Sequence, residues 1–157
     1  MGTELVCVDC TVSGRPHRLI VCPRAQATGL EGPFDHIVMT GPDSDPVVRP
    51  EGAVRVLELL FDDVEDGEDA WWGRPLVPMD RAQAALVAEF VASEDLAEAL
   101  VVSCDGGISR SAGVAAGILA ATANDDSELF RRKCPNSTCR RLVMEAVAER
   151  LEDDRNL

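Results

Sequence analysis

The sequence predicts an α/β fold with a central, mostly parallel sheet of about four to five strands and helices on both faces. Short apolar runs rich in valine and isoleucine recur along the chain, each bounded by glycine, proline or aspartate, as is typical of strands. Between and after these runs, apolar residues recur with helical spacing. The length of 157 residues suits one domain, 1–157.

Five segments are predicted as strands. Several are apolar at successive positions, which indicates strands that are covered on both faces. The last one ends in a cysteine and directly precedes a helical pattern, at the sheet edge where α/β folds bind ligands. In chain order the predicted strands are 5–10, 17–22, 35–40, 54–61 and 99–104.

Three segments are predicted as helices. The first, 79–95, carries one apolar stripe made of Ala82, Leu86 and Phe90, with Val87 and Val91 alongside. The second, 109–123, is apolar nearly all round and is predicted to be buried. The third is capped by Asn136 or Ser137 and continues through 138–152. Its apolar side consists of Leu142, Val143, Ala146 and Val147.

Composition and charge restrict the partners. Hydrophobic residues make up 46% and charged residues 27%, as in globular chains. The net charge of −13 repels phosphate polyanions, so neither a nucleic acid nor a membrane is expected as a partner. Because neither a targeting segment nor a membrane-spanning run is visible, the predicted location is the cytoplasm. Segments 41–52 and 62–78 are predicted as exposed loops.

A thiol, two glycines and an arginine follow one another at the end of the fifth strand, in the stretch VVSCDGGISRSAG. The five residues between Cys104 and Arg110 suffice for one tight loop, whose glycines let N–H groups turn inward. Inward N–H groups and the N-terminus of the following helix form a nest for anions. A guanidinium binds two phosphate oxygens, and the same positive surroundings stabilise a thiolate. The stretch therefore predicts an anion site beside a nucleophilic Cys104.

This stretch resembles the signature loop of the protein tyrosine phosphatase superfamily, Cys-x5-Arg-Ser/Thr, with Gly107 at the third place after the cysteine. The flanks are similar to the dual-specificity-like branch, because a strand ends in FDD and the stretch FRRKCPN stands at 130–136. The similarity covers residues 35–150. It implies the cysteine phosphatase fold and hydrolysis of phosphate monoesters, without a metal ion or cofactor.

The resemblance implies a role for each loop residue. Cys104 attacks phosphorus to form a phosphocysteine, Arg110 and the loop amides hold the phosphoryl oxygens, and Ser111 helps the sulfur to leave. One position departs from the family, because Ser103 stands where a histidine usually precedes the cysteine. Its hydrogen bond to the loop is weaker, so we expect a less stabilised thiolate. The implied phosphate-binding residues are Asp105, Gly106, Gly107, Ile108, Ser109 and Arg110.

The resemblance also implies a general acid, an aspartate on the loop that follows the FDD strand. Asp63 matches the family position best, and Asp62 is the alternative. The loop carries an insertion relative to the branch, so Asp66 or Asp69 can reach the site instead. A general acid protonates the departing oxygen and typically contributes about 10²–10⁴ in rate.

Other polar and aromatic residues are given structural roles. Cys7 and Cys10 lie three apart on a strand and should face opposite sides, so a zinc site shared with Cys134 and Cys139 is not expected. The thiols are expected to be reduced, and a redox role of Cys7, Cys10 or Cys22 toward Cys104 stays open. His17 and His36 are predicted to be ordinary strand-flanking residues. One of Trp71 and Trp72 is predicted to pack against its own domain, with lining of the pocket rim as the alternative.

The sequence thus predicts a cysteine-dependent phosphatase. Its substrate would be a phosphorylated protein, with phosphotyrosine or phosphoserine/threonine favoured, or a small phosphomonoester. Two alternatives stay open: a phosphate-recognition module that is catalytically weak because of Ser103, and an enzyme that uses the same loop for sulfur transfer or arsenate reduction. The acid-rich loop weighs against the last, since sulfur transfer needs no such acid. No oligomeric state is indicated.

Overall fold

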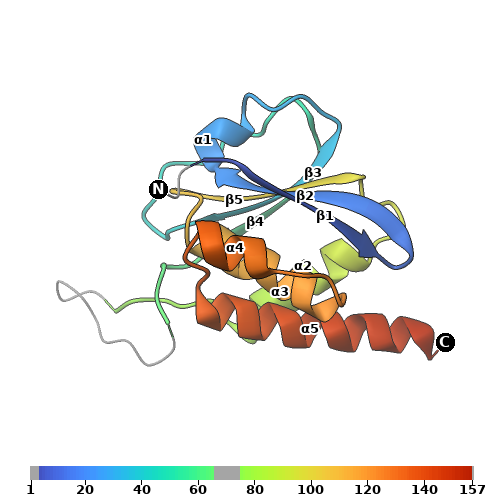
Figure 1. The fold of residues 1–157 in the computed structure, drawn as a ribbon. Helices are drawn as coiled ribbons and strands as arrows, with labels where there is room; N and C mark the ends of the chain where they lie inside the picture. The colour runs from blue at the N-terminus through green and yellow to red at the C-terminus, as the bar shows by residue number, and fades with distance from the viewer. Residues whose placement is uncertain (1–3, 66–74, 157) are drawn as a thin grey trace.

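A five-stranded sheet in the order β1-β2-β5-β3-β4 organises the computed structural model, which describes residues 4–65 and 75–156 (Figure 1). The outer pair β1–β2 is antiparallel, and the pairs β2–β5, β5–β3 and β3–β4 are parallel. The predicted α/β class with a mostly parallel sheet is therefore confirmed. The strands are β1 (Val6–Val12), β2 (Arg15–Pro23), β3 (Phe34–Thr40), β4 (Ala53–Leu60) and β5 (Ala99–Cys104).

All three predicted helices are present, and two short ones were missed. The missed helices have four and six residues, too few for a helical period to show in the sequence. The helices are α1 (Arg24–Ala27), α2 (Arg81–Ala92), α3 (Arg110–Ala121), α4 (Ser127–Arg132) and α5 (Ser137–Arg155).

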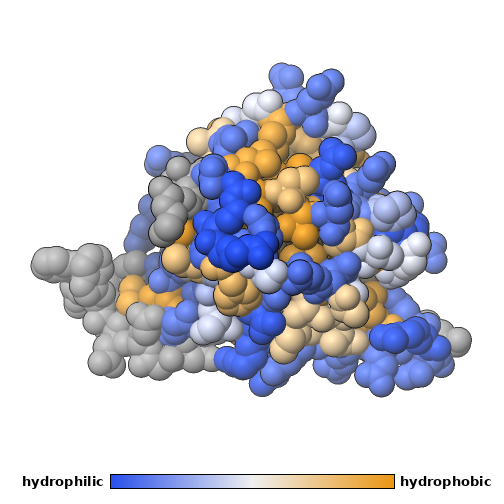
Figure 2. Space-filling model, in the orientation of Figure 1, coloured by the Kyte–Doolittle hydropathy of each residue, from blue (hydrophilic) through white to orange (hydrophobic). Residues whose placement is uncertain are grey.

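Helices lie on both faces of the sheet, as predicted, but very unequally. Of the helices in residues 4–65 and 75–156, α2 to α5 lie on one side and only the single turn α1 lies on the other (Figure 1). A small apolar cluster fills the α1 side, and apolar side chains reach the surface there above the strands (Figure 2). The buried residues of that cluster are Cys22, Ala27, Phe34, Ala53 and Val101.

Helix α2 buries only one side of the predicted stripe: Val87 and Val91 are buried as predicted. Leu86, placed in the predicted stripe, is 51% exposed, and Ala82 is exposed as well. Phe90 is only partly buried and packs under the Arg55 guanidinium, whose Cζ lies 4.1 Å from the ring centroid. Contact with α5 sets the orientation of α2, so its small residues face inward. The buried residues are Ala84, Val87, Ala88 and Val91.

Helix α3 is buried on every side over residues 110–119, as predicted. Glycine at position 113 allows α5 to come close, because a Cβ there would lie 2.5 Å from the carbonyl oxygen of Asn136. Asn136 caps α5 as expected, since its side chain accepts a hydrogen bond from the Cys139 N–H at 3.0 Å. This packing brings the start of α5 next to the start of α3.

The carboxyl ends of the four parallel strands lie at one edge of the sheet. Cys104, the last residue of β5, stands in register between Pro23 of β2 and Met39 of β3. The chain leaves this edge at Arg24, at the 41–52 loop, at Phe61 and at Asp105. The topology therefore gathers four segments around Cys104. Within the described ranges, no helix is both long and apolar enough to cross a membrane.

Candidate functional site

The loop after Cys104 needs glycine at one of its two glycine positions. Gly107 has a φ of +64°, in the left-handed region, and a Cβ there would lie 2.3 Å from the backbone nitrogen of Pro23. A Cβ on Gly106 would meet only the Ile108 side chain, at 3.7 Å or more. Gly107 thus lets the loop turn tightly over the end of β2, whereas Gly106 is not required sterically.

Arg110 begins α3 and lies under the loop, with 8% of its surface exposed. Its Nη1 donates to the carbonyl oxygen of Phe61 at 2.9 Å, and its Nη2 donates to Asp105 Oδ2 at 3.2 Å. Its Nε is buried and has no hydrogen-bond partner among the described residues. Leaving a buried cationic donor unpaired is costly, so this atom fits an anionic ligand in the loop.

Cys104 and Ser111 face each other across the start of α3. Their Sγ and Oγ atoms lie 3.2 Å apart, and both residues are buried. The sulfur also stands near the amino end of a twelve-residue helix, whose dipole favours negative charge. The predicted pairing of the thiol with a hydroxyl group is therefore present in the structure.

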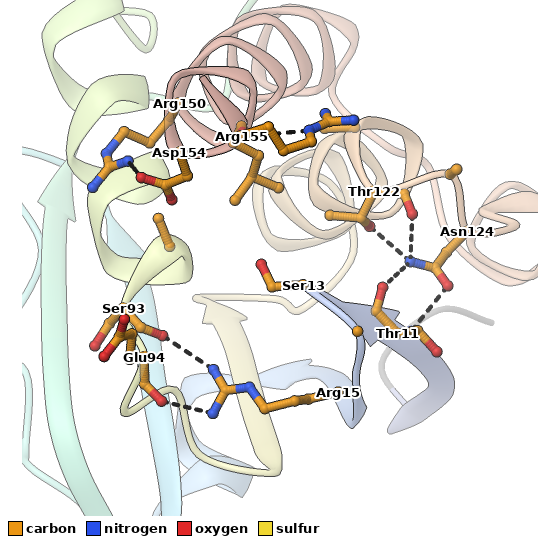
Figure 3. A pocket seen from close by; sticks show the side chains of 15 residues that line it. Thr11, Ser13, Arg15, Ser93, Glu94, Thr122, Asn124, Arg150, Asp154 and Arg155 are labelled. Carbon is orange, nitrogen blue, oxygen red and sulfur yellow. Dashed lines mark hydrogen bonds and ion pairs between the residues drawn. The ribbon is translucent and has the colours of Figure 1, made fainter. Parts of the chain in front are cut away.

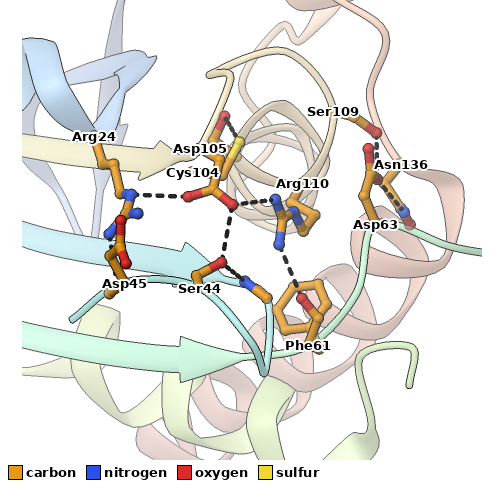
Figure 4. A network of polar contacts seen from close by, with 12 residues as sticks. Arg24, Ser44, Asp45, Phe61, Asp63, Cys104, Asp105, Ser109, Arg110 and Asn136 are labelled. Atoms are coloured by element: carbon orange, nitrogen blue, oxygen red, sulfur yellow. Dashed lines mark hydrogen bonds and ion pairs between the residues drawn. The ribbon is translucent and has the colours of Figure 1, made fainter. Parts of the chain in front are cut away.

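Asp63 and Asp62 point to different partners. Asp63 Oδ1 accepts hydrogen bonds from Ser109 Oγ at 2.7 Å and from Asn136 Nδ2 at 3.1 Å, so this carboxylate adjoins the Cys104 loop (Figure 4). Asp62 Oδ2 instead accepts from the Val77 N–H at 2.8 Å and ties the two ends of the 62–78 segment together. The other two acid candidates and both tryptophans lie outside the described residues: Asp66, Asp69, Trp71 and Trp72.

The segment that resembles the family's Pro-Asn stretch holds the Cys104 loop through its backbone. The Cys134 N–H donates to the Ile108 carbonyl at 3.1 Å, and the Asn136 N–H donates to the Ser109 carbonyl at 3.0 Å. Asn136 Nδ2 also donates to the Val64 carbonyl, at 3.0 Å. Asn136 therefore connects the Cys104 loop, residues 63–64 and the first turn of α5. The sequence predicted only its role as the cap of α5.

Glu65 connects the segment that follows β4 to the start of α5. The sequence did not predict this contact. Its carboxylate accepts from the N–H groups of Ser137 and Thr138, at 3.0 and 2.9 Å. Partial burial works against the charge, but the hydrogen bonds from Ser137 and Thr138 outweigh it and lower the pKa of Glu65. The residue lies 72 positions before Ser137, so only the folded chain shows the contact.

His36 was predicted to be an ordinary strand-flanking residue, and this prediction is wrong. It lies inside β3 with 1% exposure, and its Nε2 is 2.7 Å from Ser103 Oγ on β5. Burial lowers the pKa of His36 to about 4, so its ring is neutral near pH 7. A histidine thus contacts the residue before Cys104 from the neighbouring strand. His17 also lies inside a strand, with its Nδ1 2.9 Å from the Ala97 carbonyl oxygen.

Asp105 occupies the mouth of the loop and is shared by three neighbours (Figure 4). Its Oδ1 lies 2.8 Å from Arg24 Nε, and its Oδ2 accepts from Arg110 Nη2 at 3.2 Å and from Ser44 Oγ at 3.3 Å. Arg24 is held in turn by the carbonyl oxygen of Asp45 at 3.1 Å. Arg24 was not among the predicted site residues; its place directly after a strand end is the signal that indicates it.

The remaining thiols differ from Cys104 in their surroundings. Cys7 is exposed and Cys10 is buried, as the alternation along β1 predicts. Cys22 pairs in register with Ser103 but packs in the apolar cluster on the α1 side, whereas Cys104 belongs to the core on the helix side. Burial raises the pKa of the Cys22 thiol to about 11, which disfavours its thiolate. Among the described residues, no group of three or more potential ligands is placed to hold a metal ion.

A cavity of about 1380 Å³ lies away from this loop (Figure 3). It is bounded by the β1–β2 turn, the ends of α2 and α3 and the last turns of α5. Its three arginines are engaged. Arg15 donates to the carbonyl oxygens of Ser93 and Glu94, Arg150 pairs with Asp154, and Arg155 donates to the Leu151 carbonyl oxygen. No cysteine or histidine lines it, so it shares no candidate nucleophile with the Cys104 loop.

No protein-family model matches the chain, and a search of curated proteins returns no significant match. The function must therefore be argued from the residues around Cys104 and their geometry.

Proposed function

We propose that this protein is a cysteine-dependent phosphatase of the dual-specificity-like class that hydrolyses phosphate monoesters. The observation that carries the proposal is the unpaired, buried Nε of Arg110 beneath a loop that opens with Cys104. A buried guanidinium with a free donor, at the amino end of helix α3, is suited to a phosphoryl dianion. The neighbouring thiol supplies a nucleophile, and Asp63 supplies an acid.

The first step is attack of the Cys104 thiolate on phosphorus. The phosphorus–oxygen bond to the leaving group breaks as the sulfur–phosphorus bond forms, and Asp63 gives its proton to the departing oxygen. Arg110 and the loop amides stabilise the charge that spreads over the other phosphoryl oxygens. The Ser109 and Asn136 hydrogen bonds hold the Asp63 carboxyl group beside the loop and support this role.

The second step is hydrolysis of the phosphocysteine. A water molecule attacks phosphorus, Asp63 takes its proton, and the sulfur leaves as a thiolate. Ser111 Oγ, 3.2 Å from the sulfur, donates a hydrogen bond to this thiolate and makes it a better leaving group. Inorganic phosphate is released, and the loop returns to its starting state.

The decisive experiment compares hydrolysis of an aryl phosphate by the wild-type protein and by Cys104→Ser. The serine variant should lose at least about 10³-fold in kcat, because a serine hydroxyl in this loop is a far weaker nucleophile than a thiolate. It should still bind inorganic phosphate, since Arg110 and the amides are unchanged. Equal rates for the two proteins would exclude the phosphocysteine mechanism, and binding without turnover by the wild type would indicate a phosphate-recognition module.

A further inference from the structure

The carboxylate of Asp105 already accepts a hydrogen bond from one terminal nitrogen of the Arg110 guanidinium. Oδ2 sits 3.2 Å from Arg110 Nη2, while the adjacent Nε has no partner among the described residues. The Asp105 side chain is 40% exposed and the Arg110 side chain is 9% exposed, so the carboxylate lies at the mouth and the guanidinium lies below it. An anion that enters the loop therefore meets a negative charge at the cation it must reach.

Asp105 is not needed to orient Arg110. The Arg110 Nη1 already donates to the Phe61 carbonyl at 2.9 Å, and the packed surroundings of α3 enclose the side chain. A phosphoryl group that takes both Nε and Nη2 would place two negative groups on the same nitrogen, and like charges at such distances repel. Asp105 is thus a competitor of the oxyanion rather than a brace.

Arg24 holds the other oxygen of the same carboxylate. Its Nε lies 2.8 Å from Asp105 Oδ1, and its Nη1 donates to the Asp45 carbonyl at 3.1 Å. The carboxylate can leave Arg110 while Oδ1 keeps its contact with Arg24. Arg24 is well placed for this task, because α1 begins directly after Pro23, the register partner of Cys104.

We infer that Asp105 is an internal occupant of the oxyanion site and that Arg24 is a positioning residue that retains its carboxylate when a phosphoryl group binds to Arg110. The inference rests on the proposed function, because it takes the loop to be a phosphate site. The Arg24–Asp105 pair then influences the affinity for phosphate, although neither side chain takes part in the two chemical steps.

The test is a double-mutant cycle with Arg24→Ala and Asp105→Asn. The readouts are the dissociation constant of inorganic phosphate, measured by calorimetry, and kcat and KM for an aryl phosphate. Asp105→Asn should bind phosphate about threefold to tenfold more tightly, and Arg24→Ala about as much more weakly, since the partly exposed pair is worth a modest factor. The double variant should behave like Asp105→Asn, because without the carboxylate Arg24 has nothing to retain.

Matched controls come from the far end of the molecule. Arg150 and Asp154 form an ion pair beside the cavity at the β1–β2 turn, so Arg150→Ala and Asp154→Asn change the net charge by the same amounts without touching the loop. Both should leave phosphate affinity within about twofold of the wild type. Circular dichroism and thermal unfolding check that each variant folds, and Arg24→Gln replaces Arg24→Ala if that variant does not.

Two results would overturn the inference. Weaker phosphate binding by Asp105→Asn would mean that the carboxylate braces Arg110, and additive effects in the cycle would mean that Arg24 acts on the anion directly. Failure of the proposed function would look different: no variant would turn over the ester, yet the phosphate constants would still decide the inference. If wild-type binding is too weak to measure, Asp105→Asn must acquire it, and its failure to do so also overturns the inference.

Discussion

His36 Nε2 and Ser103 Oγ lie 2.7 Å apart and join β3 to β5 one residue before Cys104. The contact is buried, with both residues at 1% exposure or less. Because a buried hydrogen bond is expensive to lose, it fixes the Ser103 side chain and the backbone that leads into the loop. The chain thus has an imidazole in contact with the residue before Cys104, although its sequence has serine and not histidine at position 103.

The first prediction concerns the pH dependence of stability. The folded-state pKa of His36 is about 4 against 6.5 for an ordinary histidine, so the unfolded chain binds this proton more readily between those values. Stability is therefore full above about pH 6.5 and falls as the pH drops toward 4, with a loss of about 2 kcal/mol at pH 5. His36→Gln should lower stability at pH 7.5 but remove this part of the acid loss. Urea unfolding at both pH values measures it.

The matched control for that experiment is Ser103→Ala, which removes the hydrogen bond and keeps the titrating ring. It should retain the acid loss. If the free energies of unfolding of the wild type and His36→Gln fall in parallel as the pH drops, His36 does not cause the acid loss of stability.

The second prediction separates the two aspartates that follow β4. Asp63→Asn should lower kcat about 10²–10³-fold for an alkyl phosphate and far less for an ester with a good leaving group, because only the poor leaving group needs the proton. Asp62→Asn is the control, since its carboxylate accepts from the Val77 N–H, whereas Asp63 accepts from Ser109 of the loop. Its change in kcat relative to the wild type should be the same for good and poor leaving groups. A leaving-group effect in Asp62→Asn alone would transfer the acid role to that residue.

The third prediction tests the guanidinium of Arg110. Lysine keeps the charge but cannot present Nε and Nη2 together, and it also loses the Nη1 contact to the Phe61 carbonyl. We expect Arg110→Lys to reduce kcat/KM by about 10²-fold or more and to weaken phosphate binding. Steady-state kinetics and calorimetry measure the two effects, with Arg150→Lys as the control. Unchanged constants would show that the loop does not bind phosphate through Arg110.

The fourth prediction concerns the cap that Glu65 places on α5. Glu65→Gln should lower the free energy of unfolding by about 1 kcal/mol at pH 7. The amide accepts fewer hydrogen bonds and carries no negative charge to stabilise the helix N-terminus. Since the pKa of Glu65 is lowered in the folded state, its contribution is present above about pH 4.5 and is lost as the pH falls below that value. Urea unfolding at pH 7 and pH 3.5 should show a smaller difference between the two proteins at the acid value. An equal difference at both would exclude a charged cap.

Local patterns in the sequence were sufficient for the strands, the three longer helices and the Cys104 loop. The runs that form β2 to β5 are apolar and bounded by turn residues, so each segment carries its own signal. Glycine at position 107 was singled out only by the resemblance, and the structure adds its physical reason, the closeness of the Pro23 backbone. The Asn136 cap was visible because capping depends on neighbours three residues apart.

The orientation of α2 was beyond local patterns. Its largest apolar residues suggested a stripe through Leu86, but the helix turns its small residues inward, since tight packing against α5 favours them. A hydrophobic period identifies a helix, and the neighbouring elements decide which of two similar faces is buried.

By itself, the sequence determined which groups form the loop, a thiol and a guanidinium separated by five residues after a strand. Only the tertiary structure decided which distant groups surround it: Asp63 rather than Asp62 at Ser109, His36 at Ser103, and Arg24 at Asp105. These contacts join residues that are 46 to 81 positions apart and depend on the order β2-β5-β3-β4, which places four strand ends side by side. Strand order is a property of the whole packed chain, because pairing between distant strands depends on the burial of all their faces at once.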